Sequence, residues 1–310
     1  MNDLTVTSSA LTTTEFKADL LSRFIAFADV KEKSKETYLR CIKQFFVYLQ
    51  QNGIKAPSRE DVIAYREGLK ESHKASTIQT YITALKIFFK FLEEQGLYKN
   101  VADHIKGAKI DRHHKKDALT SNQAHDLISD IKTDTEQGAR DYALLALMLT
   151  TGLRTIELER ANIEDIRTVG ETRVLFIQGK GRDDKNEFVK LVPNVDKALR
   201  NYLAIRGASA SDKGAPLFTG TSNRNSSRLG TRSIRGIVKT HLKAIGLDSD
   251  RLTAHSLRHS AANIALTSGT PLREVQQLLR HSNISTTMIY VNEIDRSKNT
   301  SESRIASAIF

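Results

Sequence analysis

The 310-residue sequence predicts a mainly α-helical protein of two domains, the second of which carries a small antiparallel sheet. Three observations predict this fold class. Apolar residues recur at helical spacing through residues 14–106, without the alternation typical of strands. A polar and mostly basic stretch, residues 109–116, then interrupts the pattern. Beyond it helical patterns return, broken once by two short β-branched segments, residues 172–178 and 186–193, which predict a hairpin.

The first domain is expected over residues 14–108, after a Thr- and Ser-rich N-terminus (1–13) that we expect to be frayed. Start and stop signals divide it into four helices. These are a stripe from Phe16 to Phe27, a helix capped by Ser34 and ended at Gly53, one started by Ser58 with Asp61, and one opened by Ser76 and ended before Gly96.

The second domain is expected over residues 119–310, after a linker at 109–118. Thr120 and Gln123 have the spacing of a capping box, and an apolar helix that contains Leu144 is stopped by Gly152. Further helices are expected at about 195–205, 232–245, 256–268 and 271–280, with a Ser-, Asn- and Gly-rich loop at 219–230.

Composition restricts the classes of function. Hydrophobic residues make up 39% of the chain and charged residues 27%, which excludes global disorder. The net charge of +11 favours a polyanionic partner, and Lys and Arg outnumber Asp and Glu on both sides of residue 110. Both halves could therefore grip phosphates as a clamp. Cys41 is the only cysteine, so an intramolecular disulfide is excluded, and we expect it to be a small core residue.

No apolar run is long enough to span a membrane, and no signal-peptide pattern opens the chain, so a cytoplasmic protein without a membrane partner is expected. His113 and His114 lie in the basic stretch, but no further ligand stands at metal-binding spacing. We therefore interpret that stretch as a solvated linker and expect no metal.

Four separated segments contain residues that could carry chemistry. Arg154 follows the helix break at Gly152, with Glu157 one turn later. Taken alone, such a pair is an ordinary structural ion pair. Lys180 stands between two glycines at the tip of the predicted hairpin, where a long side chain could reach a ligand. Taken alone, it is an ordinary exposed turn lysine.

The other two segments are more specific. His255, Arg258 and His259 share one face of a predicted helix, and burying such a cluster without an anion would be costly. His281 precedes Tyr290 by nine positions, after a polar turn and a Thr-Thr pair. A helical tyrosine is otherwise an amphipathic core residue with its hydroxyl at the rim.

Taken together, these segments resemble the tyrosine recombinase (phage integrase) family. The ordered set is Thr-Gly-Leu-Arg154, Gly-Lys180-Gly, His255-x-x-Arg258-His, and Leu-Leu-x-His281 followed by Thr-Thr-x-x-Tyr290. The resemblance covers roughly residues 120–295, and the helical residues 14–106 resemble the SAM-like core-binding domain of the family. One departure is Arg280, which stands where the family usually has Gly and puts the local helix turn in question.

The resemblance implies a role for each residue. Arg154 and Arg258 would clamp the nonbridging oxygens of the scissile phosphate, and Lys180 would protonate the 5′-oxygen that leaves. His255 would act as acid and base on the nucleophile, and His281 would donate a further hydrogen bond to the phosphate. The remaining roles are attack by Tyr290 to give a 3′-phosphotyrosine, orientation of Arg154 by Glu157, and support of the site by His259.

Physical chemistry agrees with these implied roles. Guanidinium groups match the oxygens of a phosphodiester in bidentate geometry. A phenol with a pKa near 10 is a poor nucleophile at pH 7 and needs a base and positive charge beside it. No acidic pair suited to Mg²⁺ accompanies the motifs, so no metal and no other cofactor is expected.

The partners implied are a double-stranded DNA recombination site and three further copies of the chain on paired sites, with an accessory DNA-bending protein as an additional candidate. The length favours a simple Xer-like or small mobile-element recombinase. Two alternatives stay open, a type IB topoisomerase and a catalytically silent DNA-binding protein of the same fold. After Tyr290 a polar stretch, residues 292–303, precedes Ile305, Ile309 and Phe310, which we expect to dock on a neighbouring subunit or on their own domain.

Overall fold

The structure is a computed structural model that describes residues 14–109, 117–179, 182–208, 212, 214–221, 227–298 and 301–310. Contacts divide the chain into two compact units, Met1–Arg112 and His113–Phe310. The division falls within the stretch expected to be a linker. His113, His114 and Lys180 lie outside the described residues, so the sequence-based expectations for them are not tested by the structure.

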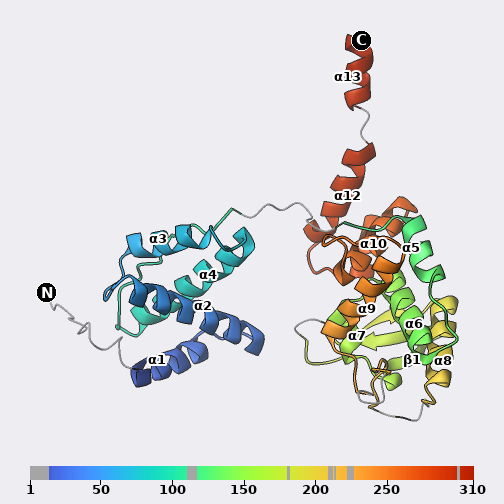
Figure 1. Ribbon diagram of the computed structural model, residues 1–310, viewed down its shortest axis with the longest axis horizontal. Helices are drawn as coiled ribbons and strands as arrows, with labels where there is room; N and C mark the ends of the chain where they lie inside the picture. Colours follow the sequence, from blue (N-terminus) through green and yellow to red (C-terminus); the bar gives the residue numbers. More distant parts are fainter. Residues whose placement is uncertain are drawn as a thin grey trace. The chain divides into compact units, whose positions relative to one another are not determined.

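The described part of the first unit is helical, as predicted (Figure 1). Its helices are α1 (Thr14–Phe27), α2 (Glu32–Gln51), α3 (Arg59–Leu69) and α4 (Ala75–Glu94). The capping box of α3 is confirmed, since Ser58 and Asp61 bond each other's backbone N–H groups. The expected starts at Ser34 and Ser76 are wrong. Lys31 and Lys74 stand at the N-cap positions, and neither side chain caps its helix, so both helices start without the polar cap that sequence patterns reveal.

Aromatic side chains form the core of this unit. The Phe24 ring meets the Phe88 ring edge to face with centroids 5.2 Å apart, and the Phe45 ring meets the Phe89 ring at 6.0 Å. Such pairs add specific geometry to the area that the rings bury. Cys41 is fully buried among them, as expected from its place in the apolar stripe of α2.

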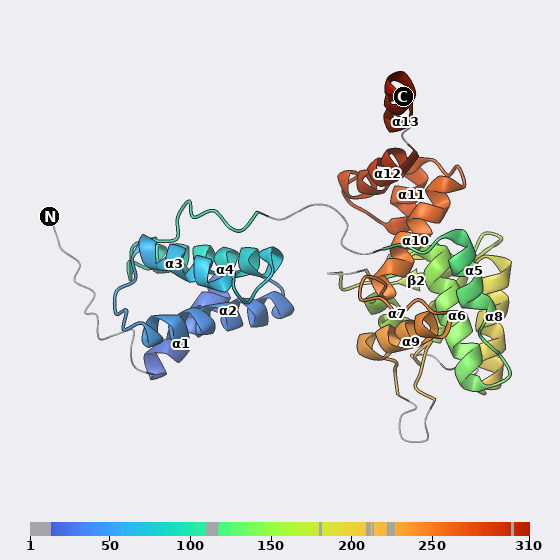
Figure 2. The same ribbon diagram turned by 45° about the horizontal axis from the view of Figure 1, so that its top comes forward.

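The second unit is also mostly helical and contains a small sheet (Figure 2). Its helices are α5 (Ser121–Ser129), α6 (Glu136–Thr151), α7 (Thr155–Arg160), α8 (Pro193–Ile205), α9 (Thr231–Ala244), α10 (Ala254–Thr267), α11 (Leu272–Leu279), α12 (Ser285–Lys298) and α13 (Ser301–Ile309), with a short 3-10 turn at Ile163–Asp165. The capping box of Thr120 with Gln123 is confirmed. The polar stretch after Tyr290 is partly helical, because α12 continues to Lys298.

The sheet has the strand order β1 (Ile166–Val169), β2 (Thr172–Ile177) and β3 (Glu187–Lys190), and both pairings are antiparallel. The hairpin of β2 with β3 is confirmed, with Phe176 opposite Phe188. The sequence did not reveal β1. Three of its four residues are exposed, so it lacks the alternation of buried and exposed side chains that identifies a strand.

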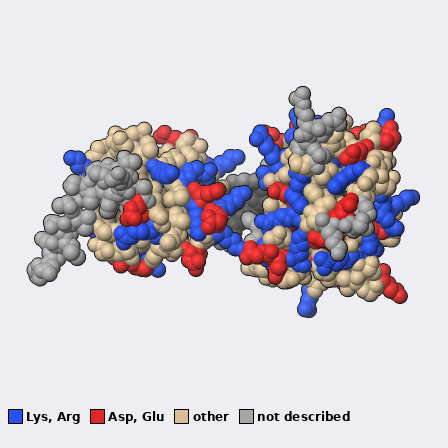
Figure 3. Space-filling model, turned by 90° about the horizontal axis from the view of Figure 1, so that it is seen from below, with Lys and Arg blue, Asp and Glu red and all other residues tan. Residues whose placement is uncertain are grey.

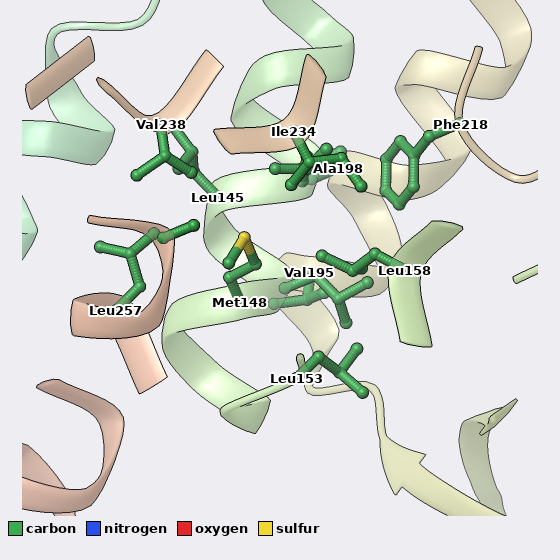
Figure 4. Close-up of a cluster of buried hydrophobic side chains, with 14 of the residues drawn as sticks. Leu145, Met148, Leu153, Leu158, Val195, Ala198, Phe218, Ile234, Val238 and Leu257 are labelled. Carbon is green, nitrogen blue, oxygen red and sulfur yellow. The ribbon is translucent and has the colours of Figure 1, made fainter. Parts of the chain in front are cut away.

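Helix α6 lies at the centre of the second unit and packs against both α8 and α10. Leu145 and Met148 of α6 meet side chains from several other elements in one buried cluster (Figure 4). Because α6 is buried nearly all round, its C-terminal end is held firmly. The candidate site residues begin directly after that end of α6.

Charged side chains of both signs are distributed over the visible surface of the described residues, among uncharged ones (Figure 3). Figure 3 shows Lys and Arg spread over one face of the molecule, with Asp and Glu interspersed. In the described part of the chain, no helix is both long and apolar enough to cross a membrane.

Candidate active site

The first element of the site is the break between α6 and α7. Gly152 ends α6 in the left-handed conformation at φ 59°, which is favourable for glycine. Arg154 then occupies the N-cap position of α7. Its Nη1 lies 2.8 Å from Oε1 of Glu157, and its backbone N–H donates to Oε2 of the same carboxylate at 2.8 Å. Glu157 is fully buried, so Arg154 is held at two points by one carboxylate.

Arg258 on α10 is the most deeply buried cation of the site, with 2% of the residue exposed. Its Nη1 donates to the carbonyl of Gly152 and its Nη2 to the carbonyl of Leu279. These carbonyls stand at the C-terminal ends of α6 and α11, where the helix dipoles attract positive charge. Burial lowers the pKa of Arg258 to about 9, and the charges of Arg154 and Arg280 act in the same direction.

His281 follows α11 and is half-buried. Its Nδ1 lies 3.0 Å from the hydroxyl of Thr287, and its carbonyl accepts a hydrogen bond from Gln276 at 3.0 Å. Burial lowers the pKa of His281 to about 4, with further lowering from Arg258 and other nearby cations. The imidazole is therefore neutral at pH 7 in the free site.

Tyr290 on α12 is 3% exposed, and its hydroxyl lies 2.7 Å from Nδ1 of His259. His259 is itself buried on α10. The ring of His255, one turn earlier and exposed to solvent, meets the His259 ring edge to face with centroids 4.5 Å apart. The contact with the tyrosine hydroxyl thus comes from His259, which the sequence had marked only as a supporting neighbour.

The hairpin that bears Lys180 is joined to α7. Arg160 of α7 donates to the carbonyl of Gly179, the residue before Lys180, at 3.4 Å. Lys185 on the other side of the turn forms an ion pair with the buried Asp165. The two sides of the turn are therefore fixed, Gly179 to α7 and Lys185 to the 3-10 turn that follows α7.

Arg280 adds a cation that no sequence-based role had included. It stands in the left-handed conformation at φ 53°, which costs an L-residue about 1–2 kcal/mol. Its Nη2 lies 3.0 Å from Oε2 of Glu157. The chain thus makes a left-handed turn at position 280, the conformation that favours glycine, although the residue is Arg.

Positive charge exceeds negative charge in this cluster. Three guanidinium groups, those of Arg154, Arg258 and Arg280, lie near one carboxylate, Glu157. Desolvating cations without matching anions is unfavourable, so such a cluster is suited to receive an anion. Among the residues that the structure describes, no group of His, Cys, Asp and Glu is arranged to hold a metal ion.

Direct contacts join five of the eight sequence-predicted residues in two groups, Arg154 with Glu157, and His255 with His259 and Tyr290. Arg258 lies close enough to both groups for the charges of Arg154, Glu157 and Tyr290 to affect its pKa. His281 lies close enough for the charges of Arg258 and Arg154 to affect its pKa. Sequence reasoning missed the roles of Arg280 and Thr287 in the cluster. The departure at Arg280 and the Thr-Thr pair were the signals that could have identified them.

A buried tyrosine hydroxyl, imidazoles beside it and a cluster of guanidinium groups are the kinds of side chain that phosphoryl transfer through a tyrosine requires, and one mostly helical unit holds them, as in the tyrosine recombinase class. Sequence comparison supports this class. The profile described as "Phage integrase family" matches residues 117–296, and "Phage integrase, N-terminal SAM-like domain" matches residues 19–98. The chain therefore belongs to the phage integrase family, the site-specific tyrosine recombinases that break and rejoin DNA.

Several curated relatives are named as Xer recombinases. Tyrosine recombinase XerC of Herpetosiphon aurantiacus is 33% identical over 76% of this chain and 75% of its own length. Tyrosine recombinase XerC of Roseiflexus castenholzii is 32% identical over 88% of each chain. The match to XerC of Corynebacterium glutamicum, 37% identical, spans only 54% of that relative's length.

Solved structures share the fold. The XerH site-specific recombinase bound to a palindromic difH substrate superposes with a TM-score of 0.73 and 22% identity, covering 88% of this chain and 80% of that one. A lambda integrase dimer bound to a COC′ core site gives a TM-score of 0.67 and 18% identity, covering 88% and 76%. At these identities the likeness shows the fold alone.

Proposed function

We propose that this chain cuts one DNA strand at a specific site by attack of Tyr290 on the scissile phosphate and later rejoins it to a second strand. The observation that carries the proposal is the gathering of Tyr290, His259, Arg258 and Arg154, from three helices, into one cationic cluster in which all but Arg154 are buried. A core tyrosine with a purely structural role would not need this excess of buried positive charge.

In the proposed reaction, the Tyr290 oxygen forms a bond to phosphorus while the bond from phosphorus to the 5′-oxygen breaks. Arg154 and Arg258 bind the nonbridging oxygens, where negative charge grows in the transition state. His255 takes the proton of the tyrosine, His259 supports the hydroxyl, and His281 donates a hydrogen bond to the phosphate. The product is a 3′-phosphotyrosine and a free 5′-hydroxyl. Because the phosphotyrosine is still a diester, rejoining requires no nucleotide.

Lys180 is the proposed donor of the proton to the departing 5′-oxygen. Two described contacts support this role. Lys185 is engaged with Asp165, and Arg160 fixes Gly179 beside α7. The described residue before Lys180, Gly179, is thus held to α7, the helix that Arg154 precedes.

Both units are proposed to grip duplex DNA as a clamp, in keeping with the excess of Lys and Arg in each half of the sequence. By analogy with a lambda integrase tetramer bound to a Holliday junction, four copies would act on two paired sites. An accessory DNA-bending protein is a further proposed partner, and the cytoplasm is the proposed compartment. Domain limits of 14–108 and 119–310, joined by residues 109–118, are proposed for the chain.

Covalent trapping tests the proposal. A duplex with a nick close to the cleavage position releases a short 5′-hydroxyl fragment by diffusion, so the adduct accumulates. The wild-type chain should give a protein–DNA band that survives denaturation. Tyr290→Phe should bind the same duplex and give no such band. An undiminished adduct with Tyr290→Phe would exclude Tyr290 as the nucleophile.

Assays of the same protein on different DNA substrates distinguish recombination from the two alternative functions. A type IB topoisomerase would relax supercoiled DNA without a marked site, whereas a recombinase exchanges strands between two marked sites. A silent DNA-binding protein would form no adduct on any nicked duplex.

A further inference from the structure

Arg280 is the residue at which this chain departs from the motif that it otherwise matches. It caps α11 with φ 53° and ψ 47°, a conformation that glycine adopts freely and that an L-residue adopts only with strain. A residue retained in such a conformation needs a compensating contact. The contacts of its side chain supply one.

The guanidinium of Arg280 is buried, with 7% of the side chain exposed. Nη1 donates to the carbonyl of Leu278 at 2.7 Å and reaches the carbonyl of Thr151 at 3.4 Å. Nη2 donates to Oε2 of Glu157 at 3.0 Å. Nε is buried without a hydrogen-bond partner. The group therefore joins the end of α11 to the end of α6 and to the acid of α7.

Glu157 is the point at which Arg280 meets Arg154. Oε1 accepts from Nη1 of Arg154, while Oε2 accepts from the backbone N–H of Arg154 and from Arg280. One fully buried carboxylate thus fixes two arginines. Burial lowers the pKa of Arg280, Glu157 opposes that shift, and Arg154 repels the same cation. The position of the carboxylate consequently depends on both partners.

We propose that Arg280 is a positioning residue for strand cleavage: it holds Glu157 in place, and Glu157 in turn fixes the guanidinium of Arg154 for the phosphate. The inference rests on the proposed role of Arg154. In this account Arg280 does not contact the DNA. Glycine would adopt this turn without strain but has no side chain to contact Glu157. Arg280 restrains that carboxylate next to the proposed phosphate site.

A purely structural role would make a different prediction. If Arg280 only caps the carbonyls of Leu278 and Thr151, its loss would lower stability and leave the cleavage step unchanged in the folded protein. If it positions Arg154, Arg280→Gly relieves the backbone strain and yet slows cleavage. A structural role therefore predicts lower stability with an unchanged cleavage rate, whereas a positioning role predicts slower cleavage although the backbone strain is relieved.

The experiment measures single-turnover cleavage of a nicked duplex at saturating protein, well below the melting temperature, for the wild type, Arg280→Gly, Glu157→Gln and the double variant. We expect Arg280→Gly to slow cleavage about tenfold or more, with the Kd for DNA changed less than about threefold. If the glycine variant does not fold, Arg280→Asn serves instead, because Asn tolerates the left-handed conformation.

The double variant isolates the connection through Glu157. In the wild-type background Glu157→Gln leaves Arg154 and Arg280 facing a neutral amide, whereas without Arg280 one of these like charges is gone. The loss caused by Glu157→Gln should therefore be smaller by about fivefold or more in the Arg280→Gly background. Arg206→Ala is the matched control, since Arg206 also donates to two carbonyls, those of Pro216 and Leu217. It should lower the melting temperature and leave cleavage unchanged.

Two outcomes would overturn the proposal: cleavage by Arg280→Gly within about threefold of the wild type, or losses from Arg280→Gly and Glu157→Gln that simply multiply. Neither outcome would contradict the proposed function of the chain. Failure of the wild-type chain to form an adduct would instead count against the proposed function itself.

Discussion

The hydroxyl of Tyr290 lies 2.7 Å from Nδ1 of His259, and both side chains are buried. The proposed nucleophile is thus already in contact with an imidazole before DNA binds. The proposed acid and base, His255, is exposed and touches the ring of His259. We therefore propose different functions for the two histidines, which substitution can distinguish.

His255→Ala should slow covalent cleavage by about a hundredfold or more, because it removes the proposed acid and base. His259→Ala should act first on stability, since it removes a buried hydrogen bond to the Tyr290 hydroxyl, and a hydrogen bond of this kind contributes about 0.5–1.5 kcal/mol. Cleavage rate against pH and thermal melting would be measured for both variants. If His259→Ala slowed cleavage more than His255→Ala, the assignment of the two histidines would have to be exchanged.

Lys180→Ala should be rescued by a substrate in which sulfur replaces the bridging 5′-oxygen, because a thiolate leaves without a general acid. Lys185→Ala is the matched control from the same hairpin. It removes the partner of the buried Asp165, so it should reduce stability without any sulfur-specific rescue. The ratio of cleavage rates on the two substrates is the measurement. Equal rescue of Lys180→Ala and Arg154→Ala would argue against a proton donor at position 180.

Gly152→Ala should damage both stability and cleavage. The residue has φ 59°, and an added Cβ would come within 2.8 Å of Cδ2 of Leu279, next to the carbonyls that hold Arg258. The backbone conformation alone should cost about 1–2 kcal/mol. Gly246→Ala is the control, because its φ is also positive but no atom lies within 4 Å of the added Cβ. Similar melting temperatures with cleavage lost only in Gly152→Ala would support the expected displacement of Arg258, and equal cleavage in both would contradict it.

His281 should titrate with a pKa of about 4 in the free protein, well below an ordinary imidazole, because it is partly buried and surrounded by cations. Since the unfolded chain binds this proton more readily, the contribution to stability is intact above pH 6.5 and is lost as the pH falls toward 4. His281→Gln should therefore weaken the fall in melting temperature between these values. NMR titration of the imidazole gives the direct measurement, and a normal pKa would contradict the expected cationic surroundings.

Deletion of residues 301–310 should leave the melting temperature of the single chain unchanged and weaken assembly on paired sites. Ile305, Ile309 and Phe310 are 57%, 69% and 103% exposed, so they contribute little to the fold of the isolated chain. Burying such side chains against a partner should contribute roughly 1.5–3 kcal/mol each before ordering costs. Thermal melting and gel-shift assembly on one and two sites are the measurements. A large fall in melting temperature would show that the segment packs on its own domain.

The sequence by itself determined the class of fold and indicated the candidate residues of the site. Helical spacing of apolar residues predicted both units because that pattern is local, and the capping boxes at Ser58 and Thr120 fixed two helix starts. The motif residues were found in the same way. Each motif lies within a few consecutive residues, as in the segment from His255 to His259.

Only the tertiary structure decided how these segments meet. The bond between Arg280 and Glu157 joins residues 123 positions apart, and that between Tyr290 and His259 joins residues 31 positions apart. Strand β1 could not be predicted from the sequence either, because its mostly exposed side chains give no alternation of buried and exposed positions. Local patterns report which face of an element is buried, but the partner on that face is set by the packing of distant elements around α6 and α10. For that reason only the folded chain shows the imidazole beside the proposed nucleophile and the second arginine on Glu157.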